Sequence, residues 1–106
     1  MIRISVMYPY RPGARFDHDY YANRHVPMAV RALGDAVRSV TIEQGLDPGP
    51  PWPSPRYVAV CNFVCDSLEA YEQAIIPHAE ALQADLANYS DVAPVIQVGA
   101  LATVGS

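Results

Sequence analysis

The stretch "RYVAVCNFVC", residues 56–65, decides the fold because it has the pattern of a β-strand that is apolar on both faces. Side chains alternate along a strand, so one face collects Tyr57, Ala59, Cys61, Phe63 and Cys65. The opposite face collects Val58, Val60, Asn62 and Val64, of which only the asparagine is polar. An antiparallel sheet with one solvated face should alternate between apolar and polar residues, so we expect both faces of this strand to be covered.

The segments around this strand predict the rest of an α+β domain. Alternating or β-branched residues predict further strands over 2–8, 36–44 and 93–104, and helical spacing predicts helices over 18–33 and 67–88. The resulting order, β-α-β-β-α-β, is typical of the ferredoxin-like arrangement, in which two helices cover one face of a four-stranded antiparallel sheet. The other face is then bare, and we expect a second copy of the chain to cover it, forming a homodimer with the sheets face to face.

Local signals set the ends of the helices. Asp17 is expected to cap the first helix and Gly34 to end it. Asp66, with a glutamate three residues later, has the spacing of a capping box for the second helix. Each helix also contains a proline, Pro27 or Pro77, and an internal proline is expected to break the helix at the preceding residues.

Residues 45–55 contain five prolines and two glycines, so they predict a loop, which carries the only tryptophan, Trp52. At 106 residues the chain has room for one hydrophobic core, and we expect a single domain over 1–106. Cys61 and Cys65 would lie about 13 Å apart along one strand, beyond disulfide reach, and are expected to be buried thiols.

The charge pattern narrows the classes of function. Seven basic residues, all of them scattered arginines, stand against eleven acidic ones for a net charge of −4, which argues against nucleic-acid binding. No apolar run approaches the roughly 20 residues of a membrane span, and the start of the chain lacks a signal-peptide core. We therefore expect no membrane partner and a cytoplasmic location.

The candidate chemistry lies on the two helices. Tyr21 and His25 fall on one face of the first helix, and the proline two residues after His25 is expected to leave a carbonyl unpaired beside it. His78 directly follows Pro77 on the second helix. With both helices on one sheet face, the two imidazoles would border a common cavity and form an acid–base pair. The competing interpretation is structural, with both histidines as core residues whose nitrogens bond to carbonyls freed by the prolines.

Other polar or aromatic residues are candidate ligands for a bound molecule. Tyr8, at the end of the first strand, is expected to point into the cavity. Asn62 would either meet a partner in the dimer interface or line a pocket, and Trp52 would either anchor its loop or form a lid. Asp85 would orient His78 only if the second helix bends. No histidine pair has the spacing of a recognisable metal site, and we expect neither a metal nor an organic cofactor.

Four stretches, "VMYPY" (6–10), "FDHDYYANRHVPM" (16–28), "RYVAV" (56–60) and "PHAEALQADLANYSDVAPVIQ" (77–97), resemble the EthD-like family over nearly the whole chain. The positions that match its pattern are Tyr8, Asp19, Tyr20, Tyr21, His25, Pro27, His78, Asp85, Asn88 and Tyr89. A departure is "QVGA" (97–100), where similar sequences have a glutamine followed closely by a serine-glutamate pair.

The resemblance implies a ferredoxin-like protomer that pairs into a dimeric α+β barrel. Members of the family resemble accessory proteins or small cofactor-free enzymes. Related barrels include isomerases, cyclases and monooxygenases, which hold an apolar, often aromatic, substrate between helices and sheet.

Two hypotheses of function follow. The first is a cofactor-independent enzyme, an isomerase, lyase or cyclase, that transfers a proton on a small apolar or aromatic carbonyl compound in a degradative or secondary pathway. His25 would be its base or acid, Tyr21 a hydrogen-bond donor and His78 a second acid-base group. The second hypothesis is a non-catalytic accessory protein that binds a hydrophobic small molecule or an oxygenase partner.

Overall fold

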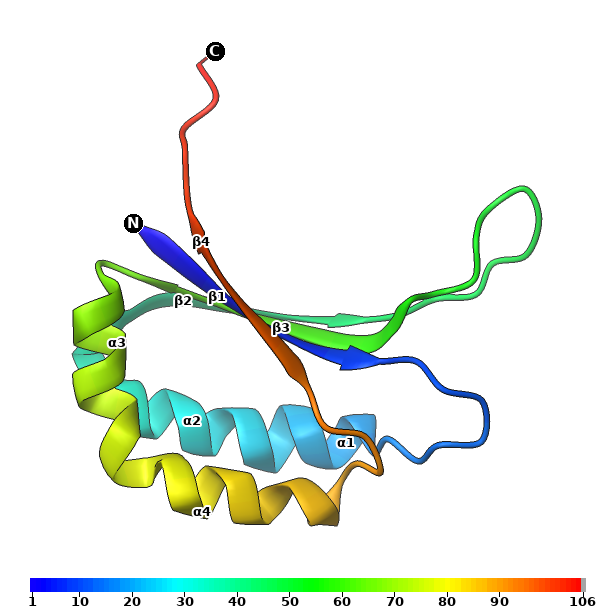
Figure 1. The fold of residues 1–106 in the computed structure, drawn as a ribbon, viewed down its shortest axis with the longest axis horizontal. Helices are drawn as coiled ribbons and strands as arrows, with labels where there is room; N and C mark the ends of the chain where they lie inside the picture. Colours follow the sequence, from blue (N-terminus) through cyan, green and yellow to red (C-terminus); the bar gives the residue numbers. More distant parts are fainter. Residues whose placement is uncertain (106) are drawn as a thin grey trace.

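The four-stranded sheet and two helical segments form the expected layers in a computed structural model that describes residues 1–105. The last residue of the expected domain, 106, lies outside the described residues. Strands β1 (Ile2–Pro9), β2 (Val37–Gln44), β3 (Tyr57–Cys65) and β4 (Val95–Ala100) pair in the order β2-β3-β1-β4, and every pairing is antiparallel. All helical segments cover one face of this sheet (Figure 1). The ferredoxin-like arrangement expected from the element order is confirmed.

The core lies between the sheet and the helices. Alternate residues of β3, namely Ala59, Cys61, Phe63 and Cys65, are buried on the helical side. Both thiols are therefore in the core, as expected. Helix α2 adds Val26, Ala29 and Leu33 to the same cluster.

The first helical segment is continuous and contains a π turn. It runs through α1 (His18–Tyr20), the π turn Tyr21–His25, α2 (Val26–Leu33) and a short 3-10 turn (Gly34–Ala36). The side chain of Asp17 accepts a hydrogen bond from the amide of Tyr20, at 3.0 Å, so the expected N-cap is confirmed. Gly34 has a positive φ of 52° at the end of α2, as a glycine C-cap requires.

The expected break directly after His25 is wrong. Val26 has helical dihedrals, with φ −62° and ψ −42°, and its amide donates to the carbonyl of Tyr21, five residues earlier. Such i→i−5 bonding defines a π turn, which takes up one extra residue. Pro27 then stands in the first turn of α2, where a missing backbone donor costs little.

The second helical segment bends at its proline, as expected. It consists of α3 (Leu68–Ile75), the 3-10 turn Ile76–His78, α4 (Ala79–Ala84) and a second 3-10 turn, Asp85–Asn88. Figure 1 shows the change of direction between α3 and α4. Within residues 1–105, none of the helices combines the length and apolar character needed to cross a bilayer.

The expected cap of this second segment is off by one residue. The hydroxyl of Ser67 accepts a hydrogen bond from the amide of Ala70, at 3.1 Å. Asp66 instead accepts a hydrogen bond from Arg38 Nε, at 3.0 Å. The Asp66 carboxylate, which the sequence predicted to be the cap, is therefore hydrogen-bonded to Arg38 on β2.

The fourth strand is shorter than the expected 93–104. It begins at Val95, after Pro94, and ends at Ala100. Ala100 pairs with Ile2, the first residue of β1, and the amide of Leu101 donates to the carbonyl of Met1, at 3.1 Å. A strand needs a paired neighbour, so β4 ends where its pairing with β1 ends.

The proline-rich stretch 45–55 is a loop that projects away from the helices, as Figure 1 shows. Trp52 on this loop is 68 % exposed.

Candidate functional site

A cavity of about 470 Å³ lies between the helical layer and the sheet. Its walls come from α2, α3 and α4, and strands β1, β3 and β4 form its floor. The volume is in the range of small-molecule sites. The polar side chains that line it are Tyr8, Tyr21, His25, Tyr71, Gln83 and Tyr89. Within residues 1–105 no aspartate, glutamate, lysine or arginine lines this cavity, so it suits a largely uncharged ligand.

His25 lies in the cavity wall, and Asp85 holds its imidazole ring by a hydrogen bond. Its Nδ1 is 2.9 Å from Oδ2 of Asp85, and the two side chains are only 12 % and 14 % exposed. A carboxylate can only accept, so Nδ1 carries a proton and Nε2 of the neutral ring is a base. No hydrogen bond within residues 1–105 uses Nε2. Every fully buried side-chain nitrogen and oxygen there has a partner, so Nε2 keeps some exposure, and the residue that carries it lines the cavity.

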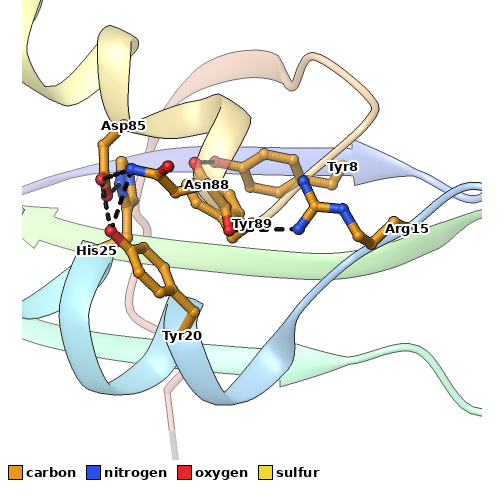
Figure 2. Close-up of polar contacts among 7 residues, drawn as sticks. All are labelled: Tyr8, Arg15, Tyr20, His25, Asp85, Asn88 and Tyr89. Atoms are coloured by element: carbon orange, nitrogen blue, oxygen red, sulfur yellow. Dashed lines mark hydrogen bonds and ion pairs between the residues drawn. The ribbon is translucent and has the colours of Figure 1, made fainter.

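Asp85 is itself fixed by two further donors (Figure 2). The hydroxyl of Tyr20 donates to Oδ1 at 2.7 Å, and Nδ2 of Asn88 donates to the same oxygen at 2.9 Å. Burial alone would raise the pKa of Asp85, but the hydrogen bonds from Tyr20, Asn88 and His25 outweigh it and lower that pKa. The carboxylate also raises the pKa of Tyr20, because the Tyr20 hydroxyl donates a hydrogen bond to it that would be lost with the proton. Asp85 is therefore ionised at neutral pH.

A short clasp aligns the two helical segments. We use this name for residues 15–17, before α1, and residues 89–91, after the last 3-10 turn. The amide of Asp17 donates to the carbonyl of Tyr89 at 2.7 Å, and the amide of Asp91 donates to the carbonyl of Arg15 at 3.0 Å. The Arg15 guanidinium also donates to the carbonyl of Ala87, at 2.7 Å. The clasp thus places the end carrying Asp85 beside the turn that carries His25.

Aromatic rings surround the imidazole. The ring centroid of His25 is 4.5 Å from that of Tyr89 and 5.6 Å from that of Tyr21, with which it stacks at an interplanar angle of 15°. The π turn presents Tyr21 and His25 on the same side of the helix. Tyr8, Tyr21 and His25 all line one cavity.

The other candidate residues lie elsewhere. His78 is exposed and does not line the cavity, so the expected pair of imidazoles on one cavity is wrong. The 3-10 turn at Pro77 redirects the helix and leaves His78 facing solvent. Asp85 contacts His25 rather than His78 and stands behind the cavity wall. Trp52, on its projecting loop, does not line the cavity and is no lid in this conformation.

Asn62 faces the side of the sheet that has no helices. Of its two expected roles, the one that placed it in the lining of a pocket is therefore wrong. Its Oδ1 accepts a hydrogen bond from the hydroxyl of Ser5, at 3.0 Å. The sheet register places Thr41 and Gln97 on the same line across the four strands. Asn62 therefore belongs to a polar row on this open face of the sheet.

Sequence reasoning missed the roles of Tyr20, Asn88 and Tyr89. The hydroxyl of Tyr20 bonds to Asp85, and the hydroxyl of Tyr89 bonds to that of Tyr8. Asp85, Asn88 and Tyr89 have the spacing i, i+3, i+4, which places polar groups on one face of a helical turn. This spacing is the feature of the sequence from which a polar cluster could have been predicted.

Comparisons with known proteins agree with this architecture. The model of the EthD domain matches residues 14–93. An EthD-like protein from Ralstonia eutropha has a similar structure, with 46 % identity, a TM-score of 0.86 and coverage of 92 % of this chain and 88 % of that one. No match was found among the curated proteins.

Two more distant structures share the fold. An ethyl tert-butyl ether D (EthD) family protein from Bacillus halodurans has 18 % identity and a TM-score of 0.69, covering 96 % of this chain and 99 % of that one. A dimeric ferredoxin-like protein from Thermobifida fusca has 17 % identity and a TM-score of 0.55, covering 94 % and 90 %. On the domain match and the close Ralstonia relative, this chain belongs to the EthD family.

Proposed function

We propose that this protein is a cofactor-independent enzyme that transfers a proton on a small apolar or aromatic carbonyl compound. The observation that carries the proposal is the position of His25, whose Nδ1 is bonded to Asp85 at 2.9 Å while its ring lines an apolar cavity. A histidine with an unprotonated Nε2 is a base suited to neutral pH.

The proposed step breaks a C–H bond next to the carbonyl of the substrate. Nε2 of His25 takes the proton, and the electron pair of that bond forms a carbon–carbon double bond while the carbonyl oxygen becomes an enolate. The Tyr21 hydroxyl donates a hydrogen bond to this oxygen, and the Asp85 carboxylate stabilises the imidazolium that has formed.

The fate of the enolate decides the class of reaction. Return of the proton from His25 to another carbon gives an isomerase, loss of a leaving group gives a lyase, and attack on a second carbonyl gives a cyclase. All three need the same base and the same largely apolar cavity.

Exchange of substrate hydrogen for solvent deuterium tests the proposal without knowledge of the natural substrate. Phenylacetone in D₂O is a suitable probe, because its methylene group lies between an aromatic ring and a carbonyl and is followed by proton NMR. We expect catalysed exchange that His25→Ala lowers by about a hundredfold. The matched control, His78→Ala, removes an exposed histidine outside the cavity and should leave exchange unchanged.

The alternative, a binding protein without catalysis, predicts a different result. The probe would then perturb NMR signals of cavity residues such as Tyr89 while exchange stays at the uncatalysed rate. The same outcome with equal affinity in His25→Ala would favour a carrier or an accessory to an oxygenase. Failure of a series of such carbonyl compounds to bind would contradict both functions.

We also propose that a second copy of the chain covers the open face of the sheet. Val58, Val60 and Val64 lie on this face and are half-buried in one copy, and the register places Met7 beside Val60 and Val95 beside Met7. The similar protein from Thermobifida fusca is dimeric. Mutual burial of this surface by two copies would remove the apolar residues from water.

A further inference from the structure

Three tyrosine rings meet at the end of the cavity beside His25, and we call them the phenol cluster. Tyr8 comes from β1, Tyr21 from the π turn, and Tyr89 from the clasp. The ring centroids of Tyr8 and Tyr21 are 5.2 Å apart, and those of Tyr21 and Tyr89 are 5.1 Å apart. Each of the three residues is at most 2 % exposed, yet each lines the cavity. The three rings are therefore buried in the wall of the cavity.

Counting hydroxyl protons shows what the phenol cluster can offer. The hydroxyls of Tyr8 and Tyr89 are 2.7 Å apart and share one hydrogen bond, which uses one of their two protons (Figure 2). The Tyr21 hydroxyl lies beside the Tyr8 hydroxyl and the Cys61 thiol and hydrogen-bonds to them, which uses a second proton. The three hydroxyls carry three protons, so one remains for a ligand.

These hydroxyls stay protonated near neutral pH. Burial raises the pKa of each of the three phenols, and it raises the pKa of the nearby Cys61 thiol to about 12. The half-buried Tyr71 on α3 is likewise held neutral, because burial raises its pKa. The unprotonated nitrogen base in this wall is Nε2 of His25, whose ring centroid is 4.5 Å from that of Tyr89. A proton released by a ligand would therefore pass to His25.

We propose that the phenol cluster is a binding site for an anionic oxygen, so that the ligands of this cavity are compounds whose bound form is an enolate or a phenolate. Neutral phenol donors in a low-dielectric site bind a localised negative oxygen more strongly than a carbonyl. The proton leaves the ligand's C–H or O–H bond and binds Nε2 of His25, which leaves an ion pair inside the cavity. This inference rests on the proposed function for the identity of the base, but its test involves no turnover.

Binding of para-nitrophenol tests the inference, because the phenol and the phenolate absorb at different wavelengths. In buffer below the pKa of the free dye, we expect the wild-type protein to increase the phenolate absorbance on binding. Tyr21→Phe keeps the ring and removes one hydroxyl of the phenol cluster, and circular dichroism checks that the fold is retained. We expect it to weaken phenolate binding about tenfold. The matched control, Tyr10→Phe, alters a tyrosine that is 48 % exposed and should match the wild type.

The other results would overturn the inference. Binding of the dye in its neutral form alone would mean that the cavity takes phenols only as apolar rings. If Tyr21→Phe and Tyr8→Phe bound the phenolate as strongly as the wild type, the anion would lie away from the phenol cluster. If the wild type did not bind the dye, the proposed binding site would be wrong. The deuterium-exchange experiment tests the proposed function independently of this inference, since exchange needs the base but not a stable bound anion.

Discussion

His25 and Asp85 are sixty residues apart in the sequence, and their side chains meet at 2.9 Å between Nδ1 and Oδ2. The contact joins the two helical segments behind the cavity wall and determines which nitrogen of the imidazole faces a ligand. Asp85 acts through His25, so it is a positioning residue.

Asp85→Asn should change which nitrogen of the His25 ring carries the proton, while the ring stays in the cavity wall. An amide can donate to Nδ1, which would move the ring proton to Nε2 and remove the base from the cavity. We expect deuterium exchange to fall by at least about tenfold, and the phenolate absorbance of the bound dye to fall with it, because both need Nε2 as the base. Nitrogen-15 NMR of the imidazole should show the change of tautomer directly. Asp66→Asn, which alters a carboxylate outside the cavity, is the control.

The pH dependence of stability should also report on Asp85. Its pKa in the folded protein is lowered, so the folded state favours the ionised form. The resulting stabilisation is fully present above the ordinary carboxyl pKa of about 4 and is lost as the pH falls through the lower native pKa. Urea unfolding between neutral and acidic pH should therefore show a steeper loss in the wild type than in Asp85→Asn. Parallel curves would show that Asp85 contributes nothing to acid unfolding.

Arg15→Ala should weaken the clasp. The guanidinium donates to the carbonyls of Ala87 and Asn88, at 2.7 and 3.3 Å, at the end of the last 3-10 turn. We expect the free energy of unfolding to fall by about 1 kcal/mol, because these contacts are exposed to water. Arg11→Ala, an exposed arginine in the same connection, serves as the control in urea titrations. A change equal to that control would mean that the backbone bonds of the clasp suffice.

Val60→Glu should separate the proposed dimer into monomers. A carboxylate in the middle of the open face would be buried without a partner. Light scattering after size-exclusion chromatography should give the mass of one chain for this variant and of two chains for the wild type. Ile76→Glu changes a residue that is 64 % exposed on the helical side and should remain dimeric. A monomeric wild type at micromolar concentration would contradict the proposed dimer.

Trp52→Ala should leave the cavity unaffected. The side chain is 68 % exposed on the loop that projects away from the helices. We expect dye affinity and exchange rate within twofold of the wild type, a change of less than about 0.5 kcal/mol. A larger loss would mean that the loop folds over the cavity when a ligand is bound.

Local pattern was enough to predict the layers of the fold and the cavity side of the first helix. Alternation in β3 and helical spacing around Tyr21 and His25 depend on neighbours close in sequence. The His25–Asp85 contact was not predictable in this way, because it depends on how two helices align across the clasp. The placement of His78 failed for a related reason, since the direction of a helix after a proline depends on the packing around it.

The π turn Tyr21–His25 has a consequence for how this site tolerates change in the gene. A regular α-helix advances about 100° per residue, so deletion of one codon within the turn would rotate everything before it by about that angle relative to α2. The hydrogen bonds from Asp17 to Tyr89 and from Tyr20 to Asp85 would then be lost, even though none of these residues had been replaced. The number of residues between Tyr20 and Val26 is therefore under as strong a constraint as the histidine it contains.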